Sequence, residues 1–299
     1  MKLEIQTEGL CCETATVYGQ SKYIGVHALA SAANSLAAAG AQYLSAGVHI
    51  TLPPDAYQSK IRAMERIIKD ICTWQGIELA EVKGTKNPAV QLPAVAVTGV
   101  GAIGRKEVNS PKTVRPGQDI ILTKWVGMDG MLQVAAEREM ELKERFSPVF
   151  IRQIWSYKKE LFAKKEVQIA RSAGVSYLCQ ITEGGVLASL WNLAKTFHVG
   201  LKVDMKRIPI LQETIEVCEQ YRLNPYQLTS VGSFLMVTDN AEALTEALRL
   251  SRVQASIIGY TTGGNAKILH NGEDIRYIDR PAPDEVFKIF EGGIAGWKI

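Results

Sequence analysis

The stretch LCQITEGGVLASLWNLA, residues 178–194, predicts a strand, a polar turn and a helix in direct succession. Gly184 and Gly185 stand where the helix begins, and the first backbone amides of a helix attract anions. The turn is therefore a candidate site for a phosphate. Gln180, however, is neutral at a point where a metal site would need a carboxylate.

The composition places the chain among folded globular proteins. Its 299 residues are enough for two domains, and 46% hydrophobic with 22% charged residues argues against disorder. The formal net charge is only +3, and basic and acidic residues are interleaved. The basic stretch 158–174 has no aromatic platform between its charges, so we interpret it as a solvated helix and expect no nucleic-acid partner.

Targeting and redox signals point to the cytoplasm. The first ten residues, MKLEIQTEGL, lack the apolar run of a signal peptide, and no stretch has 18 consecutive apolar residues. We therefore expect a cytoplasmic protein without a membrane partner and with its five cysteines reduced. Cys72, Cys179 and Cys218 are expected to be small core residues, and no C-x-x-C pair predicts a zinc site.

Strand and helix patterns alternate along the chain and predict an α/β or α+β protein. Predicted helices include 26–40, one starting at Pro53-Pro54 with Asp55 as its cap, and a long charged region at about 130–172. The polar stretch 101–119 has no periodicity and predicts a domain junction between Gly104 and Gln118. The expected domains are 1–108 and 116–290.

Six segments occur in the order and at the intervals of one family: VTGVG (97–101), VRPGQDIILTKW (114–125), TEGGVLASLW (182–191), VGLKVDMKRIPILQETIEVCE (199–219), LNPYQLTSVGSFLMV (223–237) and ASIIGYTT (255–262). In this the chain resembles the aminoimidazole ribonucleotide synthetase superfamily, also called PurM-like. The most similar branch is that of the AIR-synthase-related proteins near the hydrogenase maturation factor that dehydrates a thiocarboxamide.

The resemblance implies a two-domain fold. Strands of the N-terminal domain would complete a barrel across a dimer, and the C-terminal domain would be a ferredoxin-like α/β sandwich. Active relatives bind ATP and magnesium in a cleft and activate an amide- or thioamide-type substrate by phosphoryl transfer.

By the same resemblance, this chain lacks the carboxylates that hold magnesium in relatives. Ala15 takes the place of an aspartate, Ser35 follows Asn34 where relatives have Asn-Asp, Gly84 precedes Thr85 where a His or Asp is usual, and Gln180 replaces another aspartate. Neutral groups cannot balance a divalent cation, so we predict no bound metal at these positions and no certain cofactor. Segments that relatives carry before the first of these positions, and a cysteine-bearing tail, are also not found in the sequence.

The remaining ligand or phosphate candidates are Asn34, Lys83, Thr85, Thr182, Glu183, Gly184 and Gly185. Lys83 could supply the charge of a lost cation, or it could be a solvated surface residue. The turn at Gly184 could instead be only structural, with Thr182 capping the helix. His27 and His49 are expected to be packed side chains.

Three functions stay open from the sequence. The first is a non-catalytic or weakened paralogue with a degenerate magnesium-ATP site, as a homodimer or a heterodimer with an intact paralogue, and with weak nucleotide or phosphate binding. The second is an active ATP-dependent enzyme whose metal ligands come from other positions. The third is a scaffold in metal-cofactor assembly.

Overall fold

The computed structural model describes residues 9–41, 44–104 and 113–290. The chain divides into two compact units, Met1–Ser110 and Pro111–Ile299, and each is described by itself. The division falls inside the predicted junction, of which residues 105–112 lie outside the described residues. That the second unit folds independently stays a prediction.

The described residues of the first unit form a four-stranded sheet in the order β1–β4–β2–β3. Its strands are antiparallel except for β2 and β3, which run parallel. Their bounds are Gly9–Tyr18 for β1, Leu44–Leu52 for β2, Glu78–Lys86 for β3 and Ala94–Ile103 for β4. The predicted barrel would need the strands of a second subunit, and it stays a prediction.

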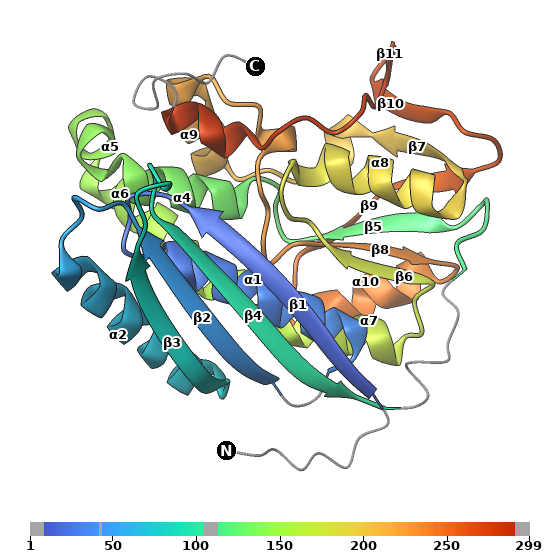
Figure 1. Ribbon diagram of the computed structural model, residues 1–299. Helices are drawn as coiled ribbons and strands as arrows, with labels where there is room; N and C mark the ends of the chain where they lie inside the picture. Colours follow the sequence, from blue (N-terminus) through green and yellow to red (C-terminus); the bar gives the residue numbers. More distant parts are fainter. Residues whose placement is uncertain (1–8, 42–43, 105–112, 291–299) are drawn as a thin grey trace. The chain divides into compact units, whose positions relative to one another are not determined.

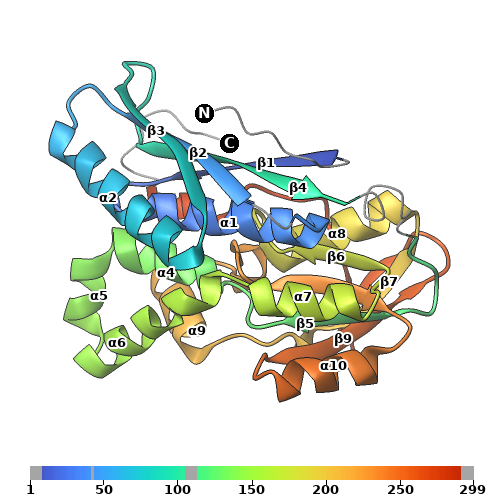
Figure 2. The ribbon, with the colours of Figure 1, turned by 90° about the horizontal axis from the view of Figure 1, so that it is seen from below.

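Helices α1 (Ile24–Ala39) and α2 (Gln58–Gln75) cover one face of this sheet (Figure 2). Small residues let them approach closely, because a Cβ added to Gly25 would lie 2.6 Å from Ile68 Cδ1. Neither helix covers the opposite face, which we call the outer face. On β1 the outer face carries the exposed residues Leu10, Cys12, Thr14, Thr16 and Tyr18.

The predicted start of α2 at Pro53-Pro54 is wrong. The helix begins at Gln58, and its N-cap residue is Tyr57, which has an extended backbone, rather than Asp55. Residues before it form a turn instead, in which Ala56 N–H donates to the Pro53 carbonyl. Lys86 Nζ donates to the Pro54 carbonyl at 3.1 Å, which helps to hold this turn beside the end of β3.

The second unit contains a mixed sheet in which seven strands of the described residues have the order β11–β10–β7–β9–β5–β8–β6 (Figure 1). The strands are β5 Asp119–Thr123, β6 Tyr177–Gln180, β7 Gly200–Asp204, β8 Phe234–Thr238, β9 Ala255–Thr262, β10 Lys267–Asn271 and β11 Asp274–Tyr277. Only the pair β10 and β7 is parallel. All four residues of the edge strand β11 are exposed.

Four neighbouring strands, β9, β5, β8 and β6, form an antiparallel core. Helix α7 (Lys164–Ser172) precedes β6, and α10 (Ala241–Leu250) connects β8 to β9. The succession β5–α7–β6–β8–α10–β9 with this strand order is the βαββαβ arrangement of ferredoxin-like domains. The predicted ferredoxin-like sandwich is therefore confirmed.

Helix α8 (Gly185–Phe197) lies on one face of the sheet, and α7 and α10 lie on the other (Figure 1). The face under α8 is closed by an apolar core to which α8 contributes Val186, Leu190, Leu193 and Ala194. This packing fixes the start of α8, and with it the turn at Gly184, at the end of β6.

The predicted helical region at about 130–172 consists of several shorter helices. They are α4 Met128–Glu137, α5 Glu139–Arg145, α6 Pro148–Ser156 and α7, with a 3₁₀ turn η1 at Tyr157–Leu161. The break before α6 has a local cause, because Phe146 is extended and Ser147 Oγ accepts the Phe150 N–H as a cap. Helix α9 (Gln212–Tyr221) packs against α4 and α6.

None of the described helices is long and apolar enough to cross a membrane.

One lysine is buried at the end of β5. Lys124 is 3% exposed, and its backbone φ of 56° is one that residues other than glycine rarely adopt. Its Nζ lies 2.7 Å from the buried carboxylate of Glu166 and donates to the Glu160 carbonyl at 2.6 Å and to the Phe162 carbonyl at 3.3 Å. The lysine therefore joins β5 to η1 and α7.

We expect Lys124→Met to lower the free energy of unfolding by about 3–5 kcal/mol, because Glu166 would keep a buried charge without its partner. Denaturant unfolding of the full chain measures this. Lys143→Met is the matched control, since Lys143 and Glu139 form an exposed pair at 2.7 Å, and we expect a loss of at most about 0.5 kcal/mol there. Equal losses in the two variants would contradict the assignment.

Candidate functional site

The turn between β6 and α8 requires both of its glycines. Gly184 and Gly185 have φ values of 78° and 65°, which favour glycine. A Cβ on Gly185 would lie 2.5 Å from the Tyr226 carbonyl oxygen and 2.8 Å from the Leu228 amide nitrogen. The backbone conformation and the close packing of the turn therefore account for both glycines without any ligand.

The backbone amides of both glycines have acceptors within the protein. Gly184 N–H donates to Asp284 Oδ2 at 2.8 Å, and Gly185 N–H donates to the Thr182 carbonyl at 3.0 Å. Asp284, rather than the Thr182 hydroxyl, thus provides the anionic cap at the start of α8. A carboxylate of the chain itself occupies the position that the sequence offered to a phosphate.

Asp284 begins the 3₁₀ turn η4 (Glu285–Phe290), where its Oδ1 accepts the Val286 N–H at 2.9 Å. It is 3% exposed. Burial raises the pKa of its carboxyl from the ordinary 3.8 to about 7, backbone N–H donors oppose that rise, and the nearby Asp129 adds to it. Asp284 is not among the residues predicted for the site, although an Asp that follows PAP and precedes a helical turn is a typical capping pattern.

Asp129 lies in the first turn of α4 and is 0% exposed. Its Oδ2 accepts hydrogen bonds from Gln133 Nε2 and Thr229 Oγ1, both at 2.9 Å. The start of α8 therefore lies near two buried carboxyl groups that come from opposite ends of the second unit's sequence.

Gln180 has a structural hydrogen bond. Its side chain is 4% exposed, and its Oε1 accepts the Gly232 N–H at 3.2 Å. Gly232 has a φ of 94°, and a Cβ there would lie 2.5 Å from the Glu160 carbonyl oxygen. The neutral amide of Gln180 thus helps to hold a loop that only glycine fits. Glu183, in contrast, is exposed.

In the first unit, strand alternation separates the predicted site residues onto two faces. Gly84 faces α2, because a Cβ there would lie 2.4 Å from Ile61 Cγ2, so its neighbours Lys83 and Thr85 belong to the outer face. Ala15 lies between the exposed Thr14 and Thr16 and therefore faces the helices.

Two further predictions concern α1 and the histidines. Asn34 is 3% exposed and Ser35 is half-buried, both on α1, and His27 is buried on the same helix as predicted. The prediction for His49 is wrong. It is exposed on the outer face because its strand position alternates away from α1 and α2, and its Nε2 lies 3.0 Å from Thr85 Oγ1.

Cysteine burial largely follows the sequence. Cys72 and Cys218 are each 2% exposed, and burial raises their thiol pKa values to about 11 and about 12. Cys179 differs from the prediction because it is only half-buried, near the edge of the sheet on β6. Among the residues that the structure describes, no group of three or more His, Cys, Asp or Glu side chains could hold a metal ion.

Comparisons with known proteins agree with this fold. The family model "AIR synthase related protein, C-terminal domain" matches residues 115–270. Carbamoyl dehydratase HypE of Rhodobacter capsulatus is 25% identical over 252 residues, which cover 84% of this chain and 72% of that protein.

Solved structures show the same fold over nearly the whole chain. HypE of E. coli, a hydrogenase maturation protein, has a TM-score of 0.75 at 20% identity and covers 93% of this chain and 88% of its own. A structure of HypE in complex with ATP has a TM-score of 0.71 at 17% identity, with coverage of 95% and 88%.

The matched family model spans more than half of the chain, and the strand order of the second unit and the likeness to HypE lead to the same assignment. The chain belongs to the AIR synthase related proteins of the PurM-like superfamily and lies near HypE within it.

Proposed function

We propose that this HypE-like chain is a non-catalytic or weakened paralogue that keeps the PurM-like fold and has a degenerate magnesium-ATP site. The observation that carries the proposal is the bond from Gly184 N–H to the Asp284 carboxylate. Phosphate groups bind at such amides because the helix end is positive. A buried carboxylate already in place repels a second anion and takes up its hydrogen bond.

The former metal positions support the same proposal. Ala15, Ser35, Gly84 and Gln180 offer no carboxylate, and magnesium is held chiefly by carboxylate and phosphate oxygens. Two of these positions have structural roles that an aspartate would disturb. Gly84 packs under Ile61, and Gln180 accepts the Gly232 N–H.

An active ATP-dependent enzyme is the alternative, and the likeness to the HypE structure in complex with ATP favours it. Phosphoryl transfer to an amide- or thioamide-type substrate would then need metal ligands from other positions of the chain. Calorimetry distinguishes the two, because magnesium-dependent ATP binding belongs to the enzyme alone.

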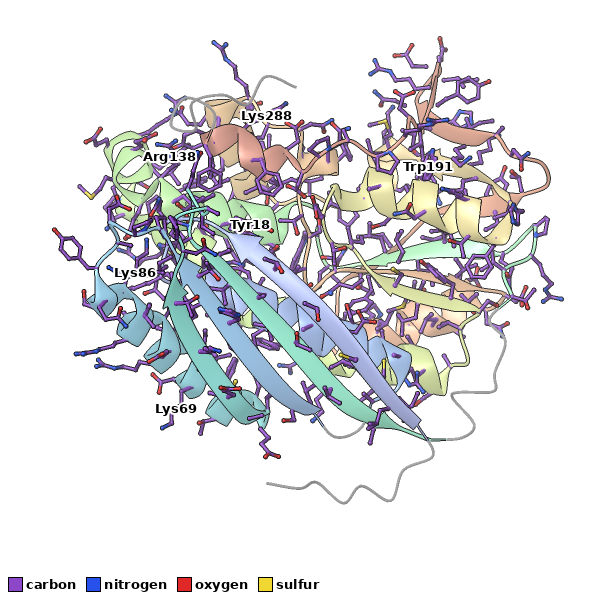
Figure 3. The ribbon with its side chains drawn as sticks, viewed as in Figure 1. Tyr18, Lys69, Lys86, Arg138, Trp191 and Lys288 are labelled. Carbon is purple, nitrogen blue, oxygen red and sulfur yellow. The ribbon has the colours of Figure 1, made fainter. Side chains whose placement is uncertain are left out.

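A two-fold dimer through the first unit is part of the proposal. The outer face is free of helices within that unit and carries the exposed side chains of Leu10, at 61%, and Tyr18, at 45%. Tyr18 is labelled in Figure 3. The β4 residues that pair with the exposed residues of β1 on this face are small, such as Ala94, Ala96 and Thr98. A sheet face of this composition is suited to packing against a second sheet.

We expect no magnesium-dependent ATP hydrolysis by the purified chain, and at most weak binding of phosphate or nucleotide near Thr182–Gly185. Titration calorimetry with ATP, with and without magnesium, and a phosphate-release assay measure this. Turnover by the unmodified chain would refute the degenerate site.

Restoring the acids gives the complementary test. The triple variant Ala15→Asp, Ser35→Asp, Gln180→Asp should gain magnesium binding, because three carboxylates replace neutral groups. The matched triple variant with Asn at the same positions has nearly the same shape without the charge and should gain none. Equal magnesium binding by the Asp and Asn triple variants would contradict the argument that the missing negative charge prevents metal binding.

Gly84→Ala should lower the free energy of unfolding by about 1–3 kcal/mol, because its Cβ would overlap Ile61. In an Ile61→Ala background the additional cost of Gly84→Ala should vanish, which a double-mutant cycle in denaturant measures. Gly47→Ala is the control in the same sheet, since the nearest atom to its Cβ would be 3.9 Å away. An unchanged cost without Ile61 would contradict the packing argument.

Light scattering at micromolar concentration should give the mass of a dimer. Thr16→Arg places a charge on the outer face and should yield monomers, because a buried unpaired charge opposes association. Thr73→Arg, at an exposed threonine on α2, should remain dimeric. A monomeric unmodified chain would exclude the dimer.

A further inference from the structure

Helix α8 and the strands β10 and β11 carry a basic patch around one tryptophan. We call it the Trp191 patch, and it consists of Trp191, Lys195, Lys267 and Arg276. Trp191, labelled in Figure 3, is half-buried because it packs against the core beneath α8. Lys195 Nζ lies 5.0 Å from the centroid of its ring, and Lys267 Nζ lies 5.7 Å from the same centroid. Two ammonium groups from different elements therefore share one indole ring.

Arg276 belongs to the same side of the sheet. The strand register places it opposite Leu269, whose side chain is part of the core beneath α8. The pairing of β10 with β11 continues one step further, because the Ile278 N–H donates to the Lys267 carbonyl at 2.9 Å. Arg276 is therefore the diagonal neighbour of Lys267 on this side of the sheet, and it is exposed.

The positive charge of the patch is not balanced within the described part of the chain. None of the three cations forms an ion pair with a described residue, and Lys195 is the one charged residue of α8. The acid that strand alternation places on the same side of β11 is Asp274, next to the hairpin turn. Three cations thus stand against one carboxylate. Because like charges repel each other, a negative group from outside would stabilise this arrangement.

The two lysines of the patch are already ordered in the free protein. The indole ring attracts both ammonium groups, and Lys267 Nζ also donates to the Asn265 carbonyl at 3.3 Å. A surface lysine usually loses side-chain entropy when it binds an anion, and a lysine that is held beforehand loses less. The patch is therefore pre-organised for negative groups. Tryptophan and arginine are also residue types in which protein interfaces are enriched.

The surroundings of the indole ring favour carboxylates over the bases of a nucleic acid. A base needs a free aromatic face on which to stack, whereas Trp191 packs against the core and has two ammonium groups over its ring. The cations come from α8, β10 and β11, so they are spread over the surface. Several negative groups along one extended segment suit this distribution better than a single small anion does.

We propose that the Trp191 patch is a docking surface for an acidic, extended segment of a partner protein. Carboxylates of that segment pair with Lys195, Lys267 and Arg276, and the indole ring holds the two lysines in position for them. This contact involves neither the turn at Gly184 nor the outer face of the first unit. It therefore goes beyond the proposed function and can be tested independently of it.

Fluorescence anisotropy of a labelled decaglutamate peptide, titrated with the full chain at low ionic strength, tests the surface. Decaglutamate should bind and decaglutamine should not, and the double variant Lys195→Gln, Lys267→Gln should weaken binding by about tenfold. The matched control is Lys158→Gln, Lys159→Gln, which removes the same charge from the same unit and includes a lysine 3.9 Å from the Trp155 ring centroid. Decaglutamate that does not bind, or equal losses in the two double variants, would overturn the proposal.

Trp191→Leu separates a built docking surface from general attraction between opposite charges. It keeps the net charge and an apolar side chain against the core but removes the ring, so the affinity for decaglutamate should fall by about threefold. Trp155→Leu should leave that affinity unchanged. Full affinity in Trp191→Leu would show that net charge alone attracts the peptide, and it would overturn the proposal. An oligothymidylate that binds as tightly as decaglutamate and loses affinity in the same variants would overturn the choice of an acidic protein segment.

Discussion

The second unit depends on the neutralisation of one buried cation. Lys124 lies at the end of the central strand β5, and its ammonium group would be costly to bury without partners. Glu166 supplies the charge, and the carbonyls of Glu160 and Phe162 accept the remaining protons. The segment between β5 and β6 must therefore bring Glu160, Phe162 and Glu166 to the ammonium group of Lys124. This cluster around Lys124 also contacts the candidate site. The Glu160 carbonyl lies against Gly232, and the Gly232 N–H donates to Gln180 Oε1.

Asp284 is the opposite case within the same unit. Lys124 has a carboxylate at 2.7 Å, whereas Asp284 has backbone donors and a second acid near it. The two residues are about equally buried, so the difference in their surroundings decides their roles. The compensated Lys124 joins β5 to the helices before β6, and the Asp284 carboxyl closes the turn at Gly184. The turn at Gly184 thus lies between the loop that Gln180 holds and the Asp284 carboxyl.

The first unit is organised by close packing under one face of its sheet. Gly25 on α1 makes room for Ile68 of α2, and Gly84 on β3 makes room for Ile61 of the same helix. Neither position has room for a larger side chain without a shift of these isoleucines. The outer face has no such constraint, and it carries exposed polar and apolar side chains together, including the hydrogen-bonded pair of Thr14 and Thr98. One face of this sheet is thus specified by packing inside the unit, and the other is available for a partner.

The sequence by itself determined the succession of strands and helices, the ferredoxin-like second unit and the relation to the AIR synthase related proteins. Apolar periodicity and glycine positions are local signals, so the alternation of strands and helices could be predicted without knowledge of distant contacts. The neutral residues at Ala15, Ser35, Gly84 and Gln180 are likewise visible without a structure.

Only the tertiary structure decided which groups meet. Asp284 and Gly184 are 100 residues apart, and Gln180 and Gly232 are 52 apart, so no local pattern could pair them. The sequence also could not assign the two faces of the first sheet. Lys83 and Gly84 are neighbours that face opposite sides of β3, and only the position of α2 shows that Gly84 is on the covered side. A side chain's hydrogen-bond partner and charge environment are set by packing between distant segments, and that packing converted a predicted phosphate turn into one already filled by the chain's own carboxylate.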